Sequence, residues 1–187
     1  MTKENLYYLA LIPPPPLQHE VRQIQEHIRD EFGSKASLKS PPHITVHMPF
    51  RLRSRKENIL LDTVEGIAAT TSPFIINLDD FNHFGSRVVY LDVVSTKCLH
   101  QLYQDTASVM RKTFHLTNAD YKNRGYHPHV TIAFRDLNQE RFQRIWTHYS
   151  NSTFQRQFEA TGMSILKHNG QCWNVLTTCQ FNKNSSD

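Results

Sequence analysis

The chain has 187 residues, of which 39% are hydrophobic and 20% are charged, and its net charge is +4 at pH 7. This length allows one domain or two small fused lobes, and the apolar fraction is sufficient for a folded core. No apolar run reaches the length of a membrane span, which excludes a helical membrane protein, and the mild positive charge favours anionic partners.

The apolar pattern of the first half predicts a strand, a helix, a strand, a helix and a strand. Prolines at the entry of the first helix suit its first turn. In chain order these elements are the strand Leu6–Ile12, the helix with Leu17, Val21, Ile24 and Ile28 on one face, the strand Pro42–Val46, the helix from about Lys56 to Ala69, and a hairpin from Phe74 that turns at Gly85.

The second half repeats this order. Ser95 and Thr96 are candidate N-caps for its first helix, and Asn169-Gly170 is a strong hairpin signal. The elements are the strand Val88–Val94, the helix with Leu99, Leu102, Thr106 and Val109 on one face, the strand Pro128–Ile132, the helix from about Asn138 to Tyr149, and a hairpin from Phe158 through Asn169-Gly170 into Cys172–Phe181.

The repeated order predicts a duplicated α+β fold. We expect a single domain, 1–187, of two lobes related by a pseudo-twofold axis, about 1–85 and 86–181, with strand exchange between lobes left open. Two facing antiparallel sheets with outer helices would enclose a central cleft. The polar segment 182–187 is expected to be a flexible tail.

Two strands of the repeat share a short motif, Pro-His-apolar-Thr-apolar. A bare His-x-Thr carries little weight, because chance gives about one match in a chain with 11 histidines. A third match, His115–Thr117, ends a helix and lacks the proline. The matches in Pro42–Val46 and Pro128–Ile132 differ, because they occupy equivalent places in the two halves.

Alternate residues of a strand share a face, so His43 and Thr45 point together, as do His129 and Thr131. A pseudo-twofold axis would set both histidines and both hydroxyls around one point. Opening a cyclic phosphodiester needs a base for the attacking water and an acid for the leaving oxygen, and histidine serves in either role near neutral pH. Threonine hydroxyls can donate to the non-bridging phosphate oxygens.

Two His-x-Thr strands in a duplicated α+β chain resemble the 2H phosphoesterase superfamily, which includes 2′-5′ RNA ligases and RNA cyclic phosphodiesterases. The resemblance extends from Leu6 to Phe181. It implies that His43 and His129 are the catalytic pair and that Thr45 and Thr131 bind the phosphate. It also implies hydrolysis of 2′,3′-cyclic phosphates on RNA ends or nucleotides, with the product phosphate on the 2′ oxygen and reversible 2′-5′ ligation as an open possibility.

Further residues are candidates for substrate binding. Counting by twos from the catalytic pair reaches His47 and Arg51 in the first strand, and His127 and Arg135 in the second. Arginine beside a phosphate gives charge-assisted hydrogen bonds, although both arginines equally fit solvated strand ends. For His47 and His127 a structural role is favoured. Tyr126 ends a Tyr-Lys-Asn-Arg-Gly-Tyr segment that faintly resembles a stacking surface for bases.

Two alternatives remain open at this point. His127 and His129 have the spacing of metal ligands on one strand face, but no carboxylate falls at a matching position and no HExxH pattern occurs, so we expect no metal or cofactor. The other alternative is a non-catalytic RNA- or nucleotide-binding module that uses the same cleft. Such a module would be expected to have lost a histidine, and both are present. The sequence does not distinguish the acid from the base, nor one cyclic substrate from another.

The remaining features concern location and assembly. Cys98, Cys172 and Cys179 contain no CxxC pair and cannot all pair with one another, so we expect free thiols and a cytoplasmic monomer. The run Leu6–Ile12 is too short for a signal peptide and four prolines follow it. RNA or a nucleotide with a cyclic phosphate is the expected partner.

Overall fold

The computed structural model describes residues 4–118 and 125–182. Within these residues the chain forms eight strands, four α-helices and two short 3-10 helices. They are β1 (Glu4–Leu11), α1 (Pro15–Phe32), η1 (Ala36–Lys39), β2 (Ile44–Arg53), η2 (Ser54–Lys56), α2 (Glu57–Ala69), β3 (Phe74–Phe84), β4 (Val88–Val93), α3 (Lys97–Phe114), β5 (His129–Phe134), α4 (Gln139–Tyr149), β6 (Gln155–Ala160), β7 (Gly162–His168) and β8 (Trp173–Gln180).

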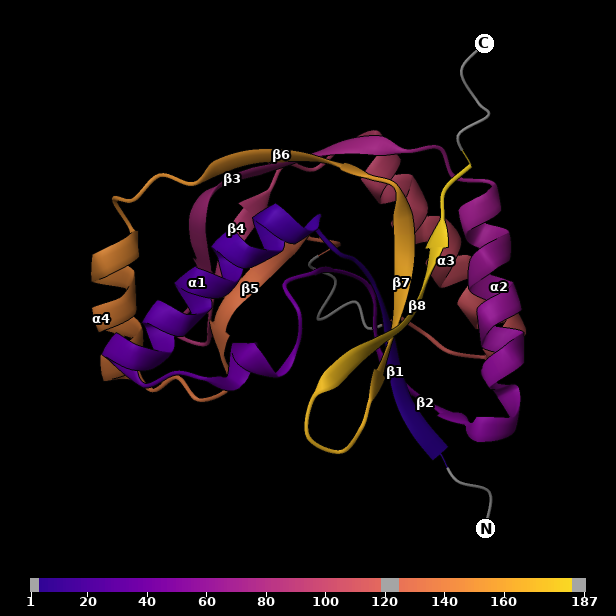
Figure 1. The fold of residues 1–187 in the computed structure, drawn as a ribbon, viewed down its shortest axis with the longest axis horizontal. Coiled ribbons are helices and arrows are strands. Elements are labelled where there is room, and N and C mark those ends of the chain that lie inside the picture. The colour runs from indigo at the N-terminus through magenta and orange to yellow at the C-terminus, as the bar shows by residue number, and fades with distance from the viewer. Residues whose placement is uncertain (1–3, 119–124, 183–187) are drawn as a thin grey trace.

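All eight strands belong to one curled antiparallel sheet in the order β6-β3-β4-β5-β2-β1-β7-β8 (Figure 1). The predicted α+β class is confirmed, but the two separate facing sheets are not, because β2 and β5 join the halves through the pair Ile44–Val130. α1 packs on β5 and beside α4, while α2 and α3 lie together over β2, β7 and β8 (Figure 1).

Strands from the two ends of the chain are interleaved in the sheet. The predicted hairpin through Asn169-Gly170 is confirmed as β7 and β8, but its predicted start at Phe158 was wrong: Phe158 lies in β6, which pairs with β3, whereas β7 pairs with β1 and β8. The chain passes between these positions at Gly162. A Cβ atom at Gly162 would lie 2.7 Å from the Cys179 carbonyl oxygen, so the crossing requires glycine.

Two apolar clusters cover the two faces of the sheet. The large core lies under the helices, where Leu17, Val21 and Ile28 of α1 are buried as their helical spacing predicts. The smaller cluster lies on the other face and contains Tyr8, Ala10 and Leu166, with Trp173 and Ile12 packed against it. The inner face of the sheet is therefore partly aromatic, and it is the face that carries the candidate site.

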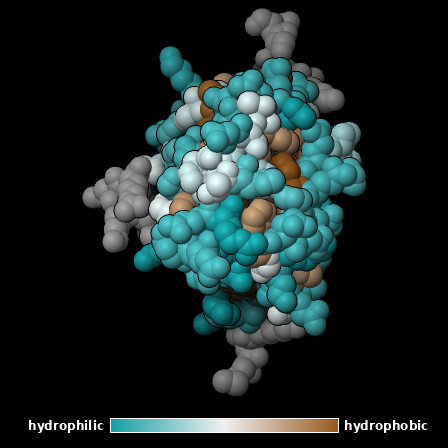
Figure 2. All heavy atoms as spheres, turned by 90° about the vertical axis from the view of Figure 1, so that its left-hand side faces the viewer, coloured by the Kyte–Doolittle hydropathy of each residue, from teal (hydrophilic) through white to brown (hydrophobic). Residues whose placement is uncertain are grey.

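The start of α3 is capped by a side chain, and the surface beside α1 and α4 is mostly polar. The Thr96 hydroxyl accepts a hydrogen bond from the Leu99 amide and caps α3, which confirms one of the two predicted caps. The surface on the side of α1 and α4 is mostly hydrophilic, with small separate apolar patches (Figure 2). No helix of the described residues is long and apolar enough to cross a membrane.

Candidate active site

The two His-x-Thr segments meet where the halves of the sheet join. Ile44 and Val130, which follow the two histidines, are paired across β2 and β5 and are buried in the core. Antiparallel pairing in this register sets His43 opposite Thr131 and Thr45 opposite His129, all on the other face. The structure thus brings together all four residues that the sequence placed around one point.

Both imidazoles are held in the same way. Nδ1 of His43 lies 2.7 Å from the carbonyl oxygen of Pro41, and Nδ1 of His129 lies 2.8 Å from that of His127. A carbonyl oxygen can only accept, so each Nδ1 carries the hydrogen. The Nε2 atom of each ring is therefore the one left to exchange a proton, as a general acid or base requires.

Aromatic rings enclose both histidines. The Tyr8 ring centroid lies 4.8 Å from that of His43. The ring centroids of Tyr90 and Phe84 lie 5.0 and 5.1 Å from that of His129. Burial, with a smaller contribution from His129, lowers the pKa of His43 to about 4 despite the hydrogen bond to Pro41. Burial also lowers the pKa of His129 from its usual 6.5. Both rings favour the neutral form in the free protein.

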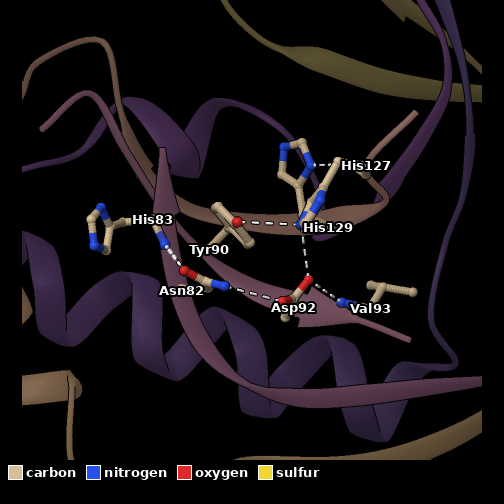
Figure 3. Close-up of polar contacts among 7 residues, drawn as sticks. All are labelled: Asn82, His83, Tyr90, Asp92, Val93, His127 and His129. Atoms are coloured by element: carbon tan, nitrogen blue, oxygen red, sulfur yellow. Dashed lines mark hydrogen bonds and ion pairs between the residues drawn. The ribbon is translucent and has the colours of Figure 1, made fainter. Parts of the chain in front are cut away.

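Among the residues that the structure describes, a carboxylate lies beside only one of the two histidines. Asp92 of β4 is the register partner of His129 and accepts a hydrogen bond from His127 Nε2 at 3.1 Å (Figure 3). Asn82 donates to the other Asp92 oxygen, at 3.2 Å. Electrostatic interaction with Asp92 acts to raise the pKa of His129, opposing the effect of burial.

The surroundings of His43 are neutral by comparison. The Tyr8 hydroxyl and the Ser40 hydroxyl lie 3.3 and 3.4 Å from its Nδ1, and they bond to each other. Ala10 follows Tyr8 on the inner face of β1, and Ile12, just after the strand, packs against the same apolar cluster. The two halves are therefore alike in how each ring is held but different in local charge.

The sheet opens beyond the junction of β2 and β5, and side chains satisfy the backbone there. The Tyr126 hydroxyl donates to the Thr45 carbonyl oxygen at 3.0 Å, and Gln25 Nε2 donates to the Thr131 carbonyl oxygen at 3.0 Å. Each of these donors comes from the half of the sequence opposite to its acceptor. The predicted binding residue Tyr126 thus supports β2 and stacks on Tyr103 at 4.0 Å.

The structure does not bring His47 to the site face. β2 contains a bulge between Thr45 and His47, so His47 stands opposite the core residue Leu9 and is only 1% exposed. Its Nδ1 donates to the Met48 carbonyl oxygen. Counting by twos along β2 fails at this bulge, because one extra residue reverses the faces.

The other predicted binding residues have mixed positions. His127 is exposed and bonds to Asp92, while its carbonyl oxygen orients His129. Arg51 lies far along β2, in a groove beside the start of β1. Arg135 is exposed and lies over the ring of Phe134, away from the paired histidines along β5. The segment before Tyr126, residues 121–124, lies outside the described residues.

Sequence reasoning missed several residues of the site. Tyr8 and Tyr90 were matched as parts of equivalent strands, but not as the rings beside the two histidines. Asp92 is two residues after Tyr90 and hence on the same face of β4, which is a signal that could have found it. Ser40 carries no comparable signal, because it precedes β2 in irregular structure. Among the described residues no group of three or more His, Cys, Asp or Glu side chains could hold a metal ion.

Similarity to known proteins completes the description of the site. The sequence matches the model of the 2′-5′ RNA ligase superfamily over residues 13–171, which is most of the chain. The chain belongs to this superfamily. The resemblance to 2H phosphoesterases that the two His-x-Thr strands indicate is therefore confirmed.

Known proteins are similar to the chain in sequence or in fold. A provisionally named phosphoesterase of Geobacillus sp. (strain WCH70) is 26% identical over 176 residues, which cover 92% of this chain and 94% of that protein. TT0787 of Thermus thermophilus superimposes with a TM-score of 0.68 at 14% identity, over 97% of this chain and all of the other. LigT of E. coli, complexed with 3′-AMP, has a TM-score of 0.66 at 19% identity, over 96% of this chain and 99% of LigT.

Proposed function

We propose that the protein is a metal-independent phosphoesterase that opens 2′,3′-cyclic phosphates on RNA ends or nucleotides. The observation that carries this proposal is the matched pair of histidines. Each has its Nδ1 hydrogen bonded to a backbone carbonyl two residues earlier, which leaves both Nε2 atoms available on one face of the sheet. Reversible 2′-5′ RNA ligation would use the same proton transfers in the opposite direction.

The reaction needs one group to remove a proton from the attacking water and another to give a proton to the leaving ester oxygen. A neutral imidazole takes a proton from water as the water oxygen bonds to phosphorus. The second imidazole, which is protonated at the start, gives its proton to the ester oxygen as the bond from phosphorus to that oxygen breaks. Attack and departure are in line, so the two groups belong on opposite sides of phosphorus. We assign to the hydroxyls of Thr45 and Thr131 the donation of hydrogen bonds to the non-bridging oxygens.

The charges around the pair favour one assignment of roles. We assign the base to His43, because burial among neutral groups keeps its ring unprotonated and its pKa near 4. We assign the acid to His129, because its hydrogen bond to the His127 carbonyl oxygen and the nearby Asp92 carboxylate act to raise its pKa, against the opposing effects of burial and of the His127 ring. Binding of an anionic phosphate also acts to raise this pKa.

Similar proteins support the substrate class. The Geobacillus relatives carry phosphoesterase names, and LigT has been crystallised with 3′-AMP, with NADP+ and with ATP. A site that accepts a nucleotide phosphate is consistent with these proteins. The same facts fit the second candidate, a non-catalytic nucleotide-binding module, which would bind the phosphate without turnover.

The test is turnover by matched variants on a panel of 2′,3′-cyclic nucleotides and 2′-5′ linked dinucleotides. His43→Ala and His129→Ala should each lose about 10²- to 10⁴-fold in rate while staying folded, and the double variant should be little worse because both act on one transition state. His115→Asn alters the third His-x-Thr match and should keep the normal rate. Near-normal turnover by either single variant would disprove the assignment, and no turnover by the natural chain would favour the binding module.

Phosphorus NMR of the product tests the geometry. An in-line arrangement between two fixed rings should give one regioisomer, and the family resemblance indicates the 2′-phosphate. A clean 3′-phosphate would preserve the two-histidine mechanism but contradict the likeness to the RNA-ligase branch. An equal mixture would contradict the in-line arrangement itself.

A further inference from the structure

A second feature lies on the same face of the sheet as His43. A groove of about 830 Å³ runs between the start of β1, the end of β2 and the hairpin of β7 and β8. Its lining includes Leu6, Arg51, His168 and Val175. Leu6 and Tyr8 share the inner face of β1, so the groove lies along the same strand as the tyrosine ring beside His43. Its volume is in the upper part of the range of about 300–1,000 Å³ for ligand pockets.

A series of aromatic rings connects the site to this groove. The Tyr8 ring centroid lies 4.8 Å from that of His43 and 4.6 Å from that of Trp173, and the Trp173 centroid lies 4.9 Å from that of His168. Trp173 is only partly buried. Aromatic side chains in a row are the surfaces on which successive nucleobases stack.

Some charged side chains of the groove have a partner of opposite charge in the ranges that the structure describes, and others do not. Lys167 is bound to the Glu57 carboxylate at 2.5 Å, and Glu4 adds one negative charge at the rim. Arg51 is exposed and forms no hydrogen bond or ion pair with any residue that the structure describes, and two more exposed arginines, Arg53 and Arg55, follow it. A guanidinium with no carboxylate partner in a groove is suited to a phosphate.

We propose that this groove binds the nucleotides on the 5′ side of a cyclic phosphate, as single-stranded RNA, with a base on Trp173 and a phosphate on Arg51. This inference rests on the proposed function, because a 2′,3′-cyclic phosphate terminates a chain at its 3′ end and everything else extends 5′ from it. From Tyr8 to Glu4 the strand spans about 13 Å, which is longer than one nucleotide. A cyclic mononucleotide leaves the groove empty, so the groove selects for RNA ends.

The first experiment compares kcat/KM for a cyclic mononucleotide with that for a trinucleotide carrying the same cyclic 3′ end. The trinucleotide should be better by about tenfold or more, as one stacked base provides. Replacing the second nucleotide with an abasic one should remove much of this gain without altering the protein. Equal turnover of the mononucleotide and the trinucleotide by the natural chain would overturn the proposal.

Arg51→Ala should lower kcat/KM for the trinucleotide only. Loss of one phosphate contact should also reduce the slope of log kcat/KM against log salt by about 0.7 for a single strand. Arg111→Ala is the matched control, because Arg111 is an exposed arginine of α3 on the opposite face of the sheet. Equal effects of Arg51→Ala on both substrates, or of the two variants on the trinucleotide, would contradict a phosphate contact at Arg51.

Binding separates this inference from the proposed function. Calorimetry with a trinucleotide that ends in an inert 3′-phosphate needs no catalysis, and the natural chain should bind it more tightly than the 3′-mononucleotide. If neither cyclic substrate is turned over but the trinucleotide binds more tightly, the chemistry is wrong and the groove stands. If the mononucleotide is turned over but the trinucleotide binds no more tightly, the groove is wrong and the chemistry stands.

Discussion

His43 and His129 are held by equivalent hydrogen bonds and aromatic contacts, yet the charges near the two rings differ. Both rings donate from Nδ1 to a carbonyl and both lie beside a tyrosine. Within the described part of the chain, only His129 has a carboxylate on the neighbouring strand, at Asp92. A duplicated site can in this way separate an acid from a base by one substitution in the supporting strand, without moving either ring.

The pH dependence follows from these surroundings. The proposed base, His43, must be neutral, hence above its pKa of about 4. The proposed acid, His129, must be protonated, hence below a pKa that burial has lowered from 6.5. We expect a bell-shaped kcat/KM with its maximum on the acid side of neutrality, rather than around pH 7, as unperturbed histidines would give. The kcat profile should extend to higher pH, because bound phosphate favours protonated His129. Rates measured from pH 4 to 9 that climb steadily would contradict this.

Asp92→Asn tests the role of the carboxylate. Without its charge the pKa of His129 should fall, so the alkaline limb of kcat/KM moves to lower pH while the acid limb, set by His43, stays. A shift of one pKa unit means roughly a tenfold loss on the alkaline side. Asp105→Asn removes an exposed carboxylate on α3 and serves as control. A uniform loss at all pH values would instead indicate a purely structural role for Asp92.

At the scale of elements, the site depends on where strands stop pairing. β2 and β5 share one residue pair, and beyond it the carbonyl groups of Thr45 and Thr131 are taken by Tyr126 and Gln25. An unpaired buried carbonyl costs about 1–3 kcal/mol, so these two side chains allow the sheet to open at the histidines. The bulge in β2 serves the same region by turning His47 into the core.

Two glycines should respond to alanine with opposite sign. At Gly162, where the chain passes from β6 to β7, the new Cβ would meet the Cys179 carbonyl oxygen at 2.7 Å, and we expect a loss of about 1–3 kcal/mol in the free energy of unfolding. Gly66 lies inside α2 with nothing within 4 Å of the added atom, so alanine should stabilise by about 0.5–1 kcal/mol. Urea unfolding of both variants checks this. Equal stability of the two would show that the crossing at Gly162 is not tight.

At the scale of the whole molecule, the proposed chemistry requires both halves of the chain and nothing else. Each histidine comes from a different half, and strands of the two halves pair with each other at β2–β5, β1–β7, β3–β4 and β3–β6. Helices from both halves cover the outer face of the sheet (Figure 1). The inner face is left for the substrate.

Chelation tests the claim that protons and fixed donors suffice. Nε2 of His127 bonds to Asp92, and the ring centroids of His127 and His129 lie 6.4 Å apart. We expect activity to survive prolonged EDTA treatment and dialysis. Loss of turnover that zinc or manganese restores would favour the metal-binding reading of His127 and His129.

The sequence by itself determined the order of the elements, the faces of the histidine strands and the pairing of the two motifs. These properties are local, because the period of two along a strand and the period of 3.6 along a helix are visible in neighbouring residues. His43 and Thr45 could be placed on one face for this reason. The Pro-His-apolar-Thr pattern then identified the family.

Only the tertiary structure decided which strands are neighbours and where the register changes. β6 and β7 are adjacent in sequence but pair with β3 and β1, because strand pairing is a contact between distant segments that a single-strand pattern does not encode. The bulge that buries His47 and the approach of Asp92 to His129 have the same origin. They depend on the register between two strands, and a shift of one residue there exchanges the core face for the site face.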